Sequence, residues 1–551
     1  MIDKTFNEKG FSWVNLNNLK YKGFISKNLK DLNKVEMDIY SKLMGTDIPS
    51  IEILGEISKE SNLSELKKLV NKINGQFVII REDDDILFAA VDNIRSMPLF
   101  YKIEDGKLKI SDIIYSIMGE KSERDDIAAK EFISSGMTWS NRTLDSDIKA
   151  LSAGEFIFLD KNSGDFIHDK YMRFSYKKGY DNSLKSSKDR IRNAYSIAVK
   201  DLAKFADGNT IMLPLSAGQD SRIVAYQLKE FGYENVICYS YGIRGNHESE
   251  ISKKIAEFLG YKWLFAPYDD IDWKEWYNSS EYRDFSHYSS NLVSTPHFQD
   301  YHAVKYFKLN NLIPDNAVFA PGHSGDFIHG DHIPKAFIKA SRLELDYISK
   351  ELLKEIANNR WYSSNELSEL LPDIKKVIGP KPNPDRDDMI EYYEYFDWIE
   401  RQSKQIANAV RVYEFFGYKW YMMLWNRVVF EAWSTIEPEL RYHRNLHYKI
   451  VEEDQRDLRR FICDESKGNP DGGIKNNIKD MARRIMPGVF KRLVFNRDNK
   501  NLISGYDSHH LNWNKIKSRD EFMKIASSCS NINGIVATDI LNNFDEEYNW
   551  D

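Results

Sequence analysis

Hydrophobic and polar positions alternate differently before and after about residue 180. In the first part, short apolar runs are separated by polar turns. Residues 77–80 (FVII) and 86–91 (ILFAAV) flank the acidic triplet 83–85, which predicts two strands joined by a charged turn. This part of the chain is therefore expected to be rich in strands.

Beyond residue 180, strand-like and helix-like segments alternate. Apolar runs at 210–215, 236–241 and 263–268 predict three strands. Two segments between them carry apolar residues at helical spacing and end at a glycine: Val224, Leu228 and Phe231 before Gly232, then Ile251, Ile255, Phe258 and Leu259 before Gly260. This order predicts a parallel sheet with right-handed crossovers, whose ligands bind beyond the carboxyl ends of the strands.

A polar stretch at 176–188 (YKKGYDNSLKSSK) separates the two patterns and is predicted to be a linker, because it offers little apolar surface to bury. We place one domain at 1–178 and a second at 186–551. Residues 346–545 are mostly helical in pattern, and 395–416 are expected to pack on the parallel-sheet domain. The sequence thus predicts an α/β protein with two domains.

Composition removes several classes of protein. The 551 residues include 77 Lys and Arg against 84 Asp and Glu, and this mild acidity argues against a nucleic-acid binder. No apolar run approaches the ~18 residues of a membrane span, and the start of the chain does not resemble a signal peptide. Three scattered cysteines predict neither disulfides nor a CxxC metal site. We expect a cytoplasmic protein.

The loop between the strand at 210–215 and the next helix has the sequence Ser216-Ala217-Gly218-Gln219-Asp220-Ser221. A strand-to-helix junction offers unpaired N–H groups and a favourable dipole for anions. Gly218 allows close approach of a phosphate, the serines add hydroxyl donors, and Asp220 can bind Mg²⁺. The alternative is an ordinary helix cap, since Ser and Asp favour that position. No GxxxxGK[ST] motif occurs, which excludes a P-loop NTPase.

The segment 215–221 (LSAGQDS) resembles the SGGxDS pyrophosphate loop of the N-type ATP pyrophosphatases, with Ala217 in place of the first glycine. Further segments resemble asparagine synthetase-like proteins in the same order. They are 239–242 (YSYG) with Glu248, Ala256 and 259–261, then 322–326 (GHSGD, similar to the GEGxDE loop), 411–417 (RVYEFFG) and 424–426 (LWN). The resemblance implies a parallel-sheet domain of the adenine-nucleotide α-hydrolase-like (PP-loop) type with a helical C-terminal part.

The first part of the chain resembles the glutamine amidotransferase domain of the same family, at 74–77 (NGQF), 92–101 (DNIRSMPLFY) and 151–155 (LSAGE). The resemblance implies an Ntn-hydrolase-like α+β sandwich. The nucleophile of that domain is an N-terminal cysteine, whereas residue 2 is Ile2 and the first cysteine is Cys238. We therefore expect a degenerate domain without glutaminase activity, as in the β-lactam synthetases and lasso-peptide cyclases of this superfamily.

The resemblance implies a two-step reaction that uses ATP and Mg²⁺. ATP adenylates a carboxylate with release of pyrophosphate, and ammonia or an amine then displaces AMP to form an amide. By resemblance, Ser216, Gly218, Asp220 and Ser221 hold pyrophosphate. Asp220 and Asp326 hold Mg²⁺, while Leu215, Tyr241 and Gly322 contact the adenosine side.

Two positions depart from the family pattern in the 322–327 loop, where glutamates are replaced by His323 and Phe327. His323 could act as a catalytic base or be a loop histidine without a proton role. Arg222, directly after the first loop, could anchor a phosphate or an acidic substrate; alternatively it is a solvated residue of the first helical turn.

Two further groups of residues are candidates for ligand contacts. His323, Asp326, His329, Asp331 and His332 lie close in sequence, but their spacing matches no zinc pattern, so we expect contact with substrate or Mg²⁺ instead. The basic stretch 474–500 contains Lys491, a candidate pyrophosphate ligand by resemblance. That stretch could also be a membrane-surface helix or a helix with one solvated face.

The first hypothesis is an ATP-dependent amide ligase that acts on a small or sugar-linked carboxylate, such as a hexuronic acid in surface-polysaccharide synthesis. The SxGxDSR loop, the 411–417 segment and the missing nucleophile carry that resemblance. The second is an intramolecular amide former, and the third a nucleotide-binding protein whose chemistry has been lost. Neither nucleic acid nor an integral membrane partner is expected, and a homodimer is left open.

Overall fold

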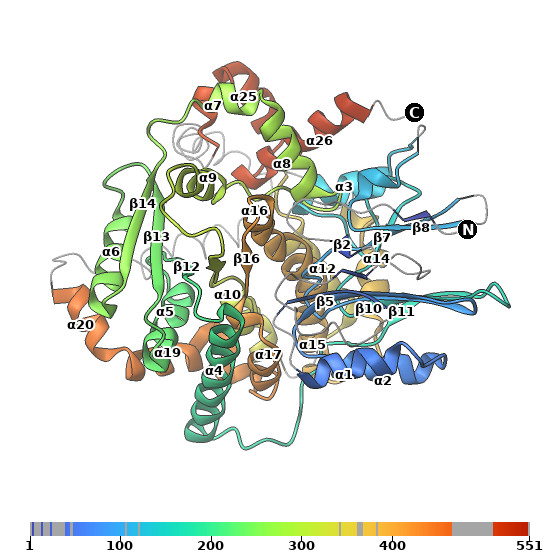
Figure 1. Ribbon diagram of the computed structural model, residues 1–551, viewed down its shortest axis with the longest axis horizontal. Helices are drawn as coiled ribbons and strands as arrows, with labels where there is room; N and C mark the ends of the chain where they lie inside the picture. The colour runs from blue at the N-terminus through green and yellow to red at the C-terminus, as the bar shows by residue number, and fades with distance from the viewer. Residues whose placement is uncertain are drawn as a thin grey trace.

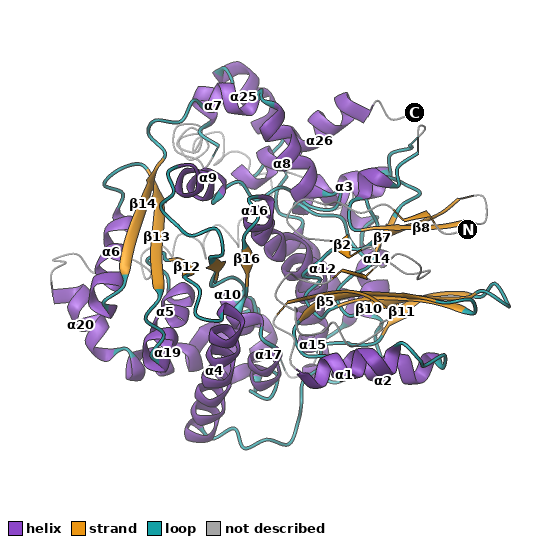
Figure 2. Ribbon diagram, in the orientation of Figure 1, coloured by secondary structure: helices purple, strands orange, loops and turns teal. Residues whose placement is uncertain are grey.

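The computed structural model describes residues 3–4, 13–14, 23–24, 39–44, 48–104, 107–119, 122–340, 343–360, 367–381, 384–464 and 511–548. Antiparallel strands gather on one side of the molecule and a parallel sheet on the other, with helices around and between them (Figures 1 and 2). The chain is an α/β protein, as predicted.

The antiparallel part contains a five-stranded sheet in the order β11-β10-β6-β5-β4 and a four-stranded sheet in the order β1-β8-β7-β9. A separate pair joins β2 to β3. The strands are β1 Asp3–Lys4, β2 Trp13–Val14, β3 Gly23–Phe24, β4 Ile39–Met44, β5 Gln76–Glu82, β6 Ile86–Val91, β7 Phe100–Glu104, β8 Lys107–Ser111, β9 Lys149–Ala150, β10 Glu155–Asp160 and β11 Phe166–Lys170.

Alternating side chains of the five-stranded sheet build two cores. Leu87 and Ala89 of β6 face the four-stranded sheet, where they cluster with Ile110. Phe88 of β6 points the other way and clusters with Leu66 of α2. Helices α1 (Ile48–Ile57) and α2 (Leu63–Lys72) cover that outer face, and α3 (Asp126–Ser135) lies beyond the four-stranded sheet (Figure 1). These layers form the predicted α+β sandwich.

The parallel sheet has the order β14-β13-β12-β15-β16. Its strands are β12 Ile211–Pro214, β13 Val236–Gly242, β14 Lys262–Pro267, β15 Val318–Phe319 and β16 Lys419–Trp420. The chain moves outward from β12 to β13 and β14, then returns to the other side of β12 with β15. Strand order therefore reverses between β12 and β15, and at such a point the loops after the two strands diverge and leave a crevice.

The predicted local elements are confirmed, with some corrections. The strands at 77–80 and 86–91 form an antiparallel pair, and the three later strands are parallel neighbours. Helix α5 (Gln219–Phe231) ends at Gly232 and α6 (His247–Leu259) at Gly260, both glycines having positive φ. The predicted apolar faces are partly wrong, because Phe231 and Phe258 are exposed. The predicted linker is also too long, since α4 (Leu184–Ala206) begins inside it.

The remaining helices surround the parallel sheet and fill the space between the two parts. They are η2 Ile114–Ser116, α7 Trp273–Tyr277, α8 Ser280–Ser290, α9 Tyr301–Leu309, α10 Gly325–Ile328, α11 Lys335–Lys339, α12 Leu345–Ile356, α14 Leu371–Ile378, α15 Arg386–Phe396, η3 Asp397–Ile406, η4 Ala407–Val410, α16 Arg411–Phe415, η5 Met423–Trp425, α17 Arg427–Trp433, α18 Pro438–Arg441, η6 Tyr442–Arg444, α19 Asn445–Asp454, α20 Arg456–Asp464, α24 Trp513–Ile516, α25 Arg519–Ala526 and α26 Ile532–Tyr548. Among the residues described, no helix combines the length and apolar character needed to cross a bilayer.

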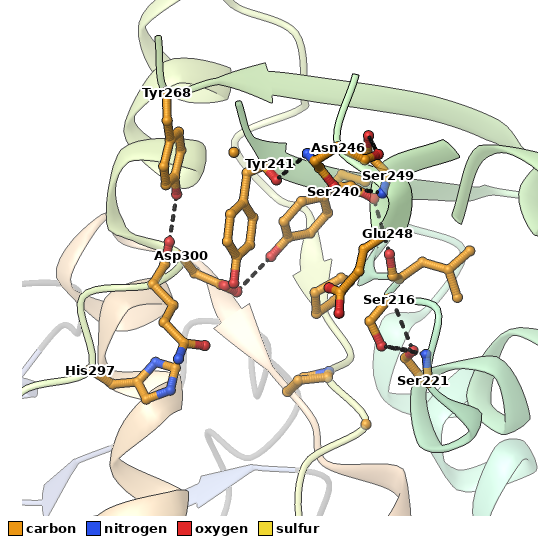
Figure 3. A pocket seen from close by; sticks show the side chains of 18 of the residues that line it. Ser216, Ser221, Ser240, Tyr241, Asn246, Glu248, Ser249, Tyr268, His297 and Asp300 are labelled. Carbon is orange, nitrogen blue, oxygen red and sulfur yellow. Dashed lines mark hydrogen bonds between the residues drawn. The ribbon is translucent and has the colours of Figure 1, made fainter. Parts of the chain in front are cut away.

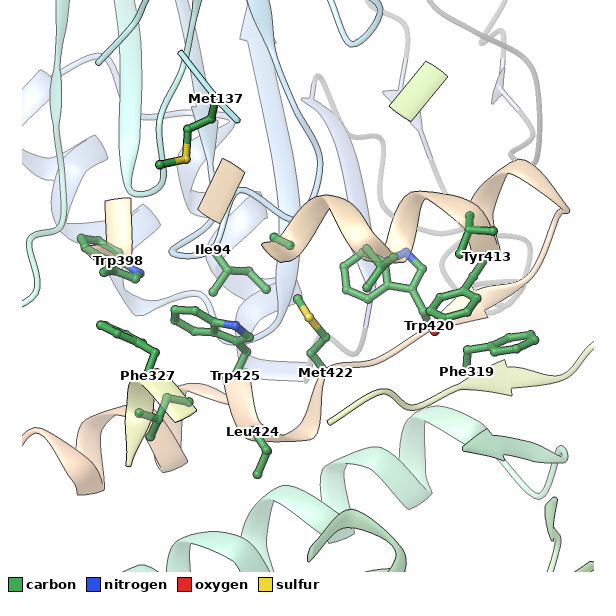
Figure 4. Packing of buried hydrophobic residues seen from close by; sticks show 14 of the residues in the cluster. Ile94, Met137, Phe319, Phe327, Trp398, Tyr413, Trp420, Met422, Leu424 and Trp425 are labelled. Atoms are coloured by element: carbon green, nitrogen blue, oxygen red, sulfur yellow. The ribbon is translucent and has the colours of Figure 1, made fainter. Parts of the chain in front are cut away.

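The segment 395–416 is helical, as predicted, but its packing differs from the prediction. Part of it, η3, is a π-helix of ten residues. Its neighbours include the antiparallel part as well as the parallel sheet. Trp398 donates its indole N–H to the carbonyl of Asn93 at 2.9 Å, while Tyr413 stacks on Phe319 of β15. One hydrophobic cluster runs through both parts, from Ile94 and Met137 past Trp398 and Trp425 to Trp420 and Phe319 (Figure 4).

A buried ion pair in η3 ties the two parts together. The side chains of Lys404 and Glu400 are both fully buried, with Nζ 2.5 Å from the carboxylate. Nζ also donates to the carbonyls of Thr138 and Ser140, and Glu400 accepts the N–H of Ser140. One cation thus satisfies a buried carboxylate and two backbone carbonyls that are distant in sequence.

Replacing Lys404 by Met should destabilise the fold by about 3–5 kcal/mol, because it leaves Glu400 as an unpaired buried charge. Urea and thermal unfolding followed by circular dichroism will measure the change. The matched control is Lys354→Met, which breaks a pair whose lysine side chain is 72% exposed and should change stability by about 0.5 kcal/mol or less. Equal losses in the two variants would contradict the assigned role.

Candidate functional site

A cavity of about 530 Å³ opens beyond the carboxyl ends of β12, β13, β14 and β15. The carboxyl ends of β12 and β13 and the loops after β12 and β15 supply much of its wall, including Leu215, Ser216, Gly218, residues 239–243 and residues 321–323. Figure 3 shows Ser216 and Ser221 on one side of it and Tyr241, Tyr268 and Asp300 on the other. The cavity lies at the reversal of strand order, where the sequence pattern placed a ligand.

The loop 215–218 is held open by its own serines. Ser216 N donates to Ser221 Oγ at 3.2 Å, and Gly218 N donates to Ser216 Oγ at 3.1 Å. Gly218 is the N-cap of α5, and among the described residues no side chain caps this helix. The alternative that Ser and Asp here form an ordinary cap is therefore wrong. The positive end of the α5 dipole faces the cavity, which favours an anion.

The second loop, 320–325, lies directly against the first turn of α5. A Cβ on Gly322 would stand 2.5 Å from Ser221 N, and one on Gly325 would stand 2.3 Å from Asp220 Cγ. Only residues without a side chain allow this contact, because each clash involves backbone or a carboxylate held by Arg444. The approach brings Gly322 and His323 into the wall of the same cavity as Ser216.

Asp220 lines the cavity and is paired with Arg444, a cation that is distant in sequence. Its Oδ1 accepts a hydrogen bond from Nη2 of Arg444 and lies 3.3 Å from Nδ1 of His329. Burial raises the pKa of the Asp220 carboxyl above its ordinary value, although Arg444 opposes the shift. A desolvated carboxylate of this kind is stabilised by a cation at close range.

Asp220, His329 and His447 place their ligand atoms within 4.8 Å of one another, which suggests a metal site. The two imidazole rings, however, stack face to face with centroids 3.7 Å apart. Arg444 Nη2 lies at the meeting point of the three groups instead.

Asp326, the second predicted Mg²⁺ ligand, also contacts an internal cation. His332 lies between Asp326, at 3.3 Å from Nε2, and Asp397, which its Nδ1 contacts. Burial alone would lower the pKa of His332, but the two carboxylates outweigh it and raise that pKa to about 10. Burial opposes ionisation of Asp326 as well, yet His332 holds its pKa well below the usual range. Asp326 and His332 thus form an ion pair beside Asp220.

The predicted cluster at 323–332 is not a single site. His323 faces the cavity, and His329 turns to Asp220 and the hydroxyl of Tyr195. His332 bridges Asp326 and Asp397, while Asp331 lies near the exposed His443. Because 325–328 form a helical turn, successive side chains point in different directions. The expectation that these groups contact substrate or Mg²⁺ stays a prediction.

Two other predicted residues have contrasting positions. His323 lines the cavity, and burial lowers its pKa, so its imidazole is neutral near pH 7 and able to accept a proton.

Arg222 is buried, so the interpretation as a solvated residue is wrong; its Nη2 donates to the carbonyl of Ala217 at 2.8 Å. Arg222 is absent from the described cavity wall, and we assign it to bracing the loop. Lys491 and the stretch 474–500 lie outside the described residues.

Sequence patterns missed several groups at the cavity. Asp300 accepts hydrogen bonds from the hydroxyls of Tyr239 at 2.9 Å and Tyr413 at 2.7 Å. Tyr241, which was predicted, stacks on Tyr268 (Figure 3), which was not. Arg444 was missed as well. None of the missed residues belongs to a local motif, so only the tertiary structure reveals them.

Comparisons with known proteins give limited similarity. No family model matches the chain. The tRNA-specific 2-thiouridylase MnmA of Campylobacter lari is 37% identical over 79 residues, which are 14% of this chain and 22% of the thiouridylase. Two solved structures align at 9% identity and a TM-score of 0.17: the glutamine phosphoribosylpyrophosphate amidotransferase of B. subtilis with ADP and GMP (41% of this chain, 70% of that one), and the allosteric regulatory enzyme of purine biosynthesis (42% and 59%). At that TM-score neither supports a conclusion, so the fold rests on the strand order described above.

Replacing Gly322 by Ala should separate the two loops, because its Cβ would meet the Ser221 backbone at 2.5 Å. We expect a stability loss of about 1–3 kcal/mol and loss of anion binding at the cavity. Thermal unfolding and calorimetric titration with pyrophosphate will measure the two effects. Gly55→Ala is the control, since nothing lies within 4 Å of that Cβ; an unchanged pyrophosphate affinity in Gly322→Ala would refute the assigned contact.

Proposed function

We propose that the protein is an ATP-dependent ligase that converts a carboxylate to its acyl adenylate and passes the acyl group to ammonia or an amine. The observation that carries the proposal is the convergence of loops 215–218 and 320–325 on one cavity. The first of these loops carries the more specific resemblance to the asparagine synthetase-like family, and the second resembles its GEGxDE loop with two departures, His323 and Phe327. The short match to a thiouridylase is consistent with a nucleotide-handling sheet but says nothing about the acyl acceptor.

The phosphates would lie at the α5 N-terminus. The hydroxyls of Ser216 and Ser221 and the free N–H groups of the first turn are the donors there. The loop is too narrow for a side chain at Gly218 without contact to Ser216 Oγ, which lies 3.0 Å from an added Cβ. Leu215, Tyr241 and Gly322 would contact the nucleoside, since all three line the cavity.

The residues present fit Mg²⁺. Carboxylate oxygens are its preferred protein ligands, and Asp220 and Asp326 each already attract a cationic side chain. A bound Mg²⁺ would neutralise charge on the transferred phosphates. The protein's own contribution is to hold the two carboxylates at neighbouring loops and to keep water away from the reacting carbonyl through the buried wall around Tyr239 and Asp300.

His323 is the proposed base. Its neutral imidazole lies in the cavity wall, with its ring 6.2 Å from that of His297, a second buried histidine whose pKa burial lowers to about 4. A neutral imidazole can take the proton that an attacking amine must lose. The carboxylic acid that we would test first is a hexuronic acid, in line with the family resemblance.

The antiparallel part is proposed to lack glutaminase activity. No cysteine precedes Cys238 in the sequence. Without a cysteine at the start of this part, the nucleophile that attacks the glutamine amide in such domains is missing.

A second candidate is a nucleotide-binding protein without turnover. The pairing of both predicted metal ligands with internal cations favours it, because Arg444 and His332 already occupy the carboxylates. Measuring turnover separates the two candidates.

Exchange of labelled pyrophosphate into ATP should depend on Mg²⁺ and on an added carboxylic acid, and Asp220→Asn should reduce it at least about 100-fold, because the metal loses a ligand next to the phosphates. The control is Glu230→Gln, an exposed carboxylate at the other end of α5, which should retain full exchange. No exchange with any of a panel of uronic, amino and peptide acids would favour the non-catalytic candidate.

Amide formation should proceed with ammonium and fail with glutamine as the nitrogen source, because no cysteine nucleophile precedes Cys238. Product analysis by mass spectrometry with ¹⁵N-labelled donors will decide. Amide carrying nitrogen from labelled glutamine, with glutamate released, would overturn the assignment of a degenerate domain.

A further inference from the structure

Arg444 reaches Asp220, a residue of the cavity wall, from a strained turn far away in the sequence. The turn between α18 and α19 places both His443 and Arg444 in the left-handed region, with φ of 57° and 59°. Non-glycine residues in this conformation cost of order 1–3 kcal/mol each and persist where the surrounding structure imposes them. The turn directs the Arg444 side chain, 12% exposed, onto Asp220.

Three acceptors surround one nitrogen of the Arg444 guanidinium. Besides Asp220 Oδ1, Nη2 lies 3.4 Å from Nδ1 of His329 and 3.3 Å from Nε2 of His447. Because a guanidinium can only donate, His329 Nδ1 is the acceptor, and its Nε2–H faces the Tyr195 hydroxyl at 2.9 Å. The surroundings of Asp220 are thus built to accept a cation.

The guanidinium is nevertheless poorly satisfied. Its Nε is buried and, among the described residues, has no hydrogen-bond partner. The contacts to the two imidazoles exceed 3.2 Å and are weak. An unsatisfied buried donor destabilises its own position, so the strongest interaction holding Arg444 in place is the ion pair with Asp220.

We propose that Arg444 and a divalent cation compete for Asp220, and that binding of a metal–nucleotide complex displaces the guanidinium from Asp220 onto the phosphates. This exchange rests on the proposed function. Asp220 Oδ1 cannot donate the same lone pairs to a metal and to Nη2 at once. A guanidinium released there lies beside the α5 N-terminus, and its planar fork suits phosphate oxygens.

The exchange predicts effects of opposite sign when Arg444 is removed. Arg444→Gln should bind Mn²⁺, used as a paramagnetic substitute for Mg²⁺, at least about tenfold more tightly in the absence of nucleotide, because the competing cation is gone. The same variant should bind ATP in the presence of Mg²⁺ at least about tenfold more weakly, because a phosphate ligand is gone. If Arg444 had a purely structural role, the variant would bind both Mn²⁺ and ATP more weakly than wild type.

Electron paramagnetic resonance of free Mn²⁺ and calorimetry with ATP will measure the two affinities in the full chain. Arg444→Lys, which keeps a charge, should fall between wild type and Arg444→Gln in both. The gain in Mn²⁺ affinity should vanish in the double variant Arg444→Gln, Asp220→Asn. Arg192→Gln, which breaks a pair with Asp454 away from the cavity, is the matched control and should change neither affinity.

The inference is overturned if Arg444→Gln binds Mn²⁺ no more tightly than wild type, or if neither protein binds Mn²⁺. Thermal unfolding will show whether Arg444→Gln folds. If it does not, Arg444→Lys is used instead, and the inference then requires that this variant bind Mn²⁺ more tightly and ATP with Mg²⁺ more weakly than wild type. Absence of acid-dependent pyrophosphate exchange alongside the opposite-sign effects would reject the ligase function while leaving the exchange at Asp220 intact.

Discussion

The site depends on one close approach between backbones. Gly322 and Gly325 let the loop after β15 lie against the first turn of α5, where any side chain would overlap Ser221 or Asp220. This contact closes the crevice that strand order opens between β12 and β15. It also wedges the Asp220 carboxylate between α5 and α10, so that it is desolvated and needs a cation. The cavity, its polarity and the pairing with Arg444 all follow from that constraint.

The antiparallel part supports the site through the π-helix η3. Gln402 accepts a hydrogen bond from Ser324 in the second loop, and Asp397 holds His332. On its other side, η3 buries Glu400 and Lys404 against residues 138–140. Each turn of this helix therefore carries a polar contact to one part or the other. Because the contacts are buried, the antiparallel part helps to fix the geometry of the loop through η3.

The sequence predicted what depends on neighbours along the chain. Strands and helices from 210 to 268 follow from local periodicity, and the strand–loop–helix at 216–221 follows from their order. The exposed positions of Phe231 and Phe258 were missed, although Leu228 and Leu259 in the same last turns are buried. Closeness in sequence at 323–332 does not place the side chains together, because a helical turn directs them to different neighbours. Arg444 lies 224 residues from Asp220, and no local pattern encodes that contact.

The charges around the loops explain how such a site can discriminate between ligands. Asp220 is paired with Arg444, while Asp326 shares His332 with Asp397. In the proposed exchange, a free metal ion would have to compete with Arg444, and a free nucleotide would find the guanidinium engaged. A metal–nucleotide complex would supply both a cation for Asp220 and an anion for Arg444, so both members of this buried pair would keep a partner. Since an unpaired buried charge costs far more than an exposed one, the exchange favours the complex over either component alone.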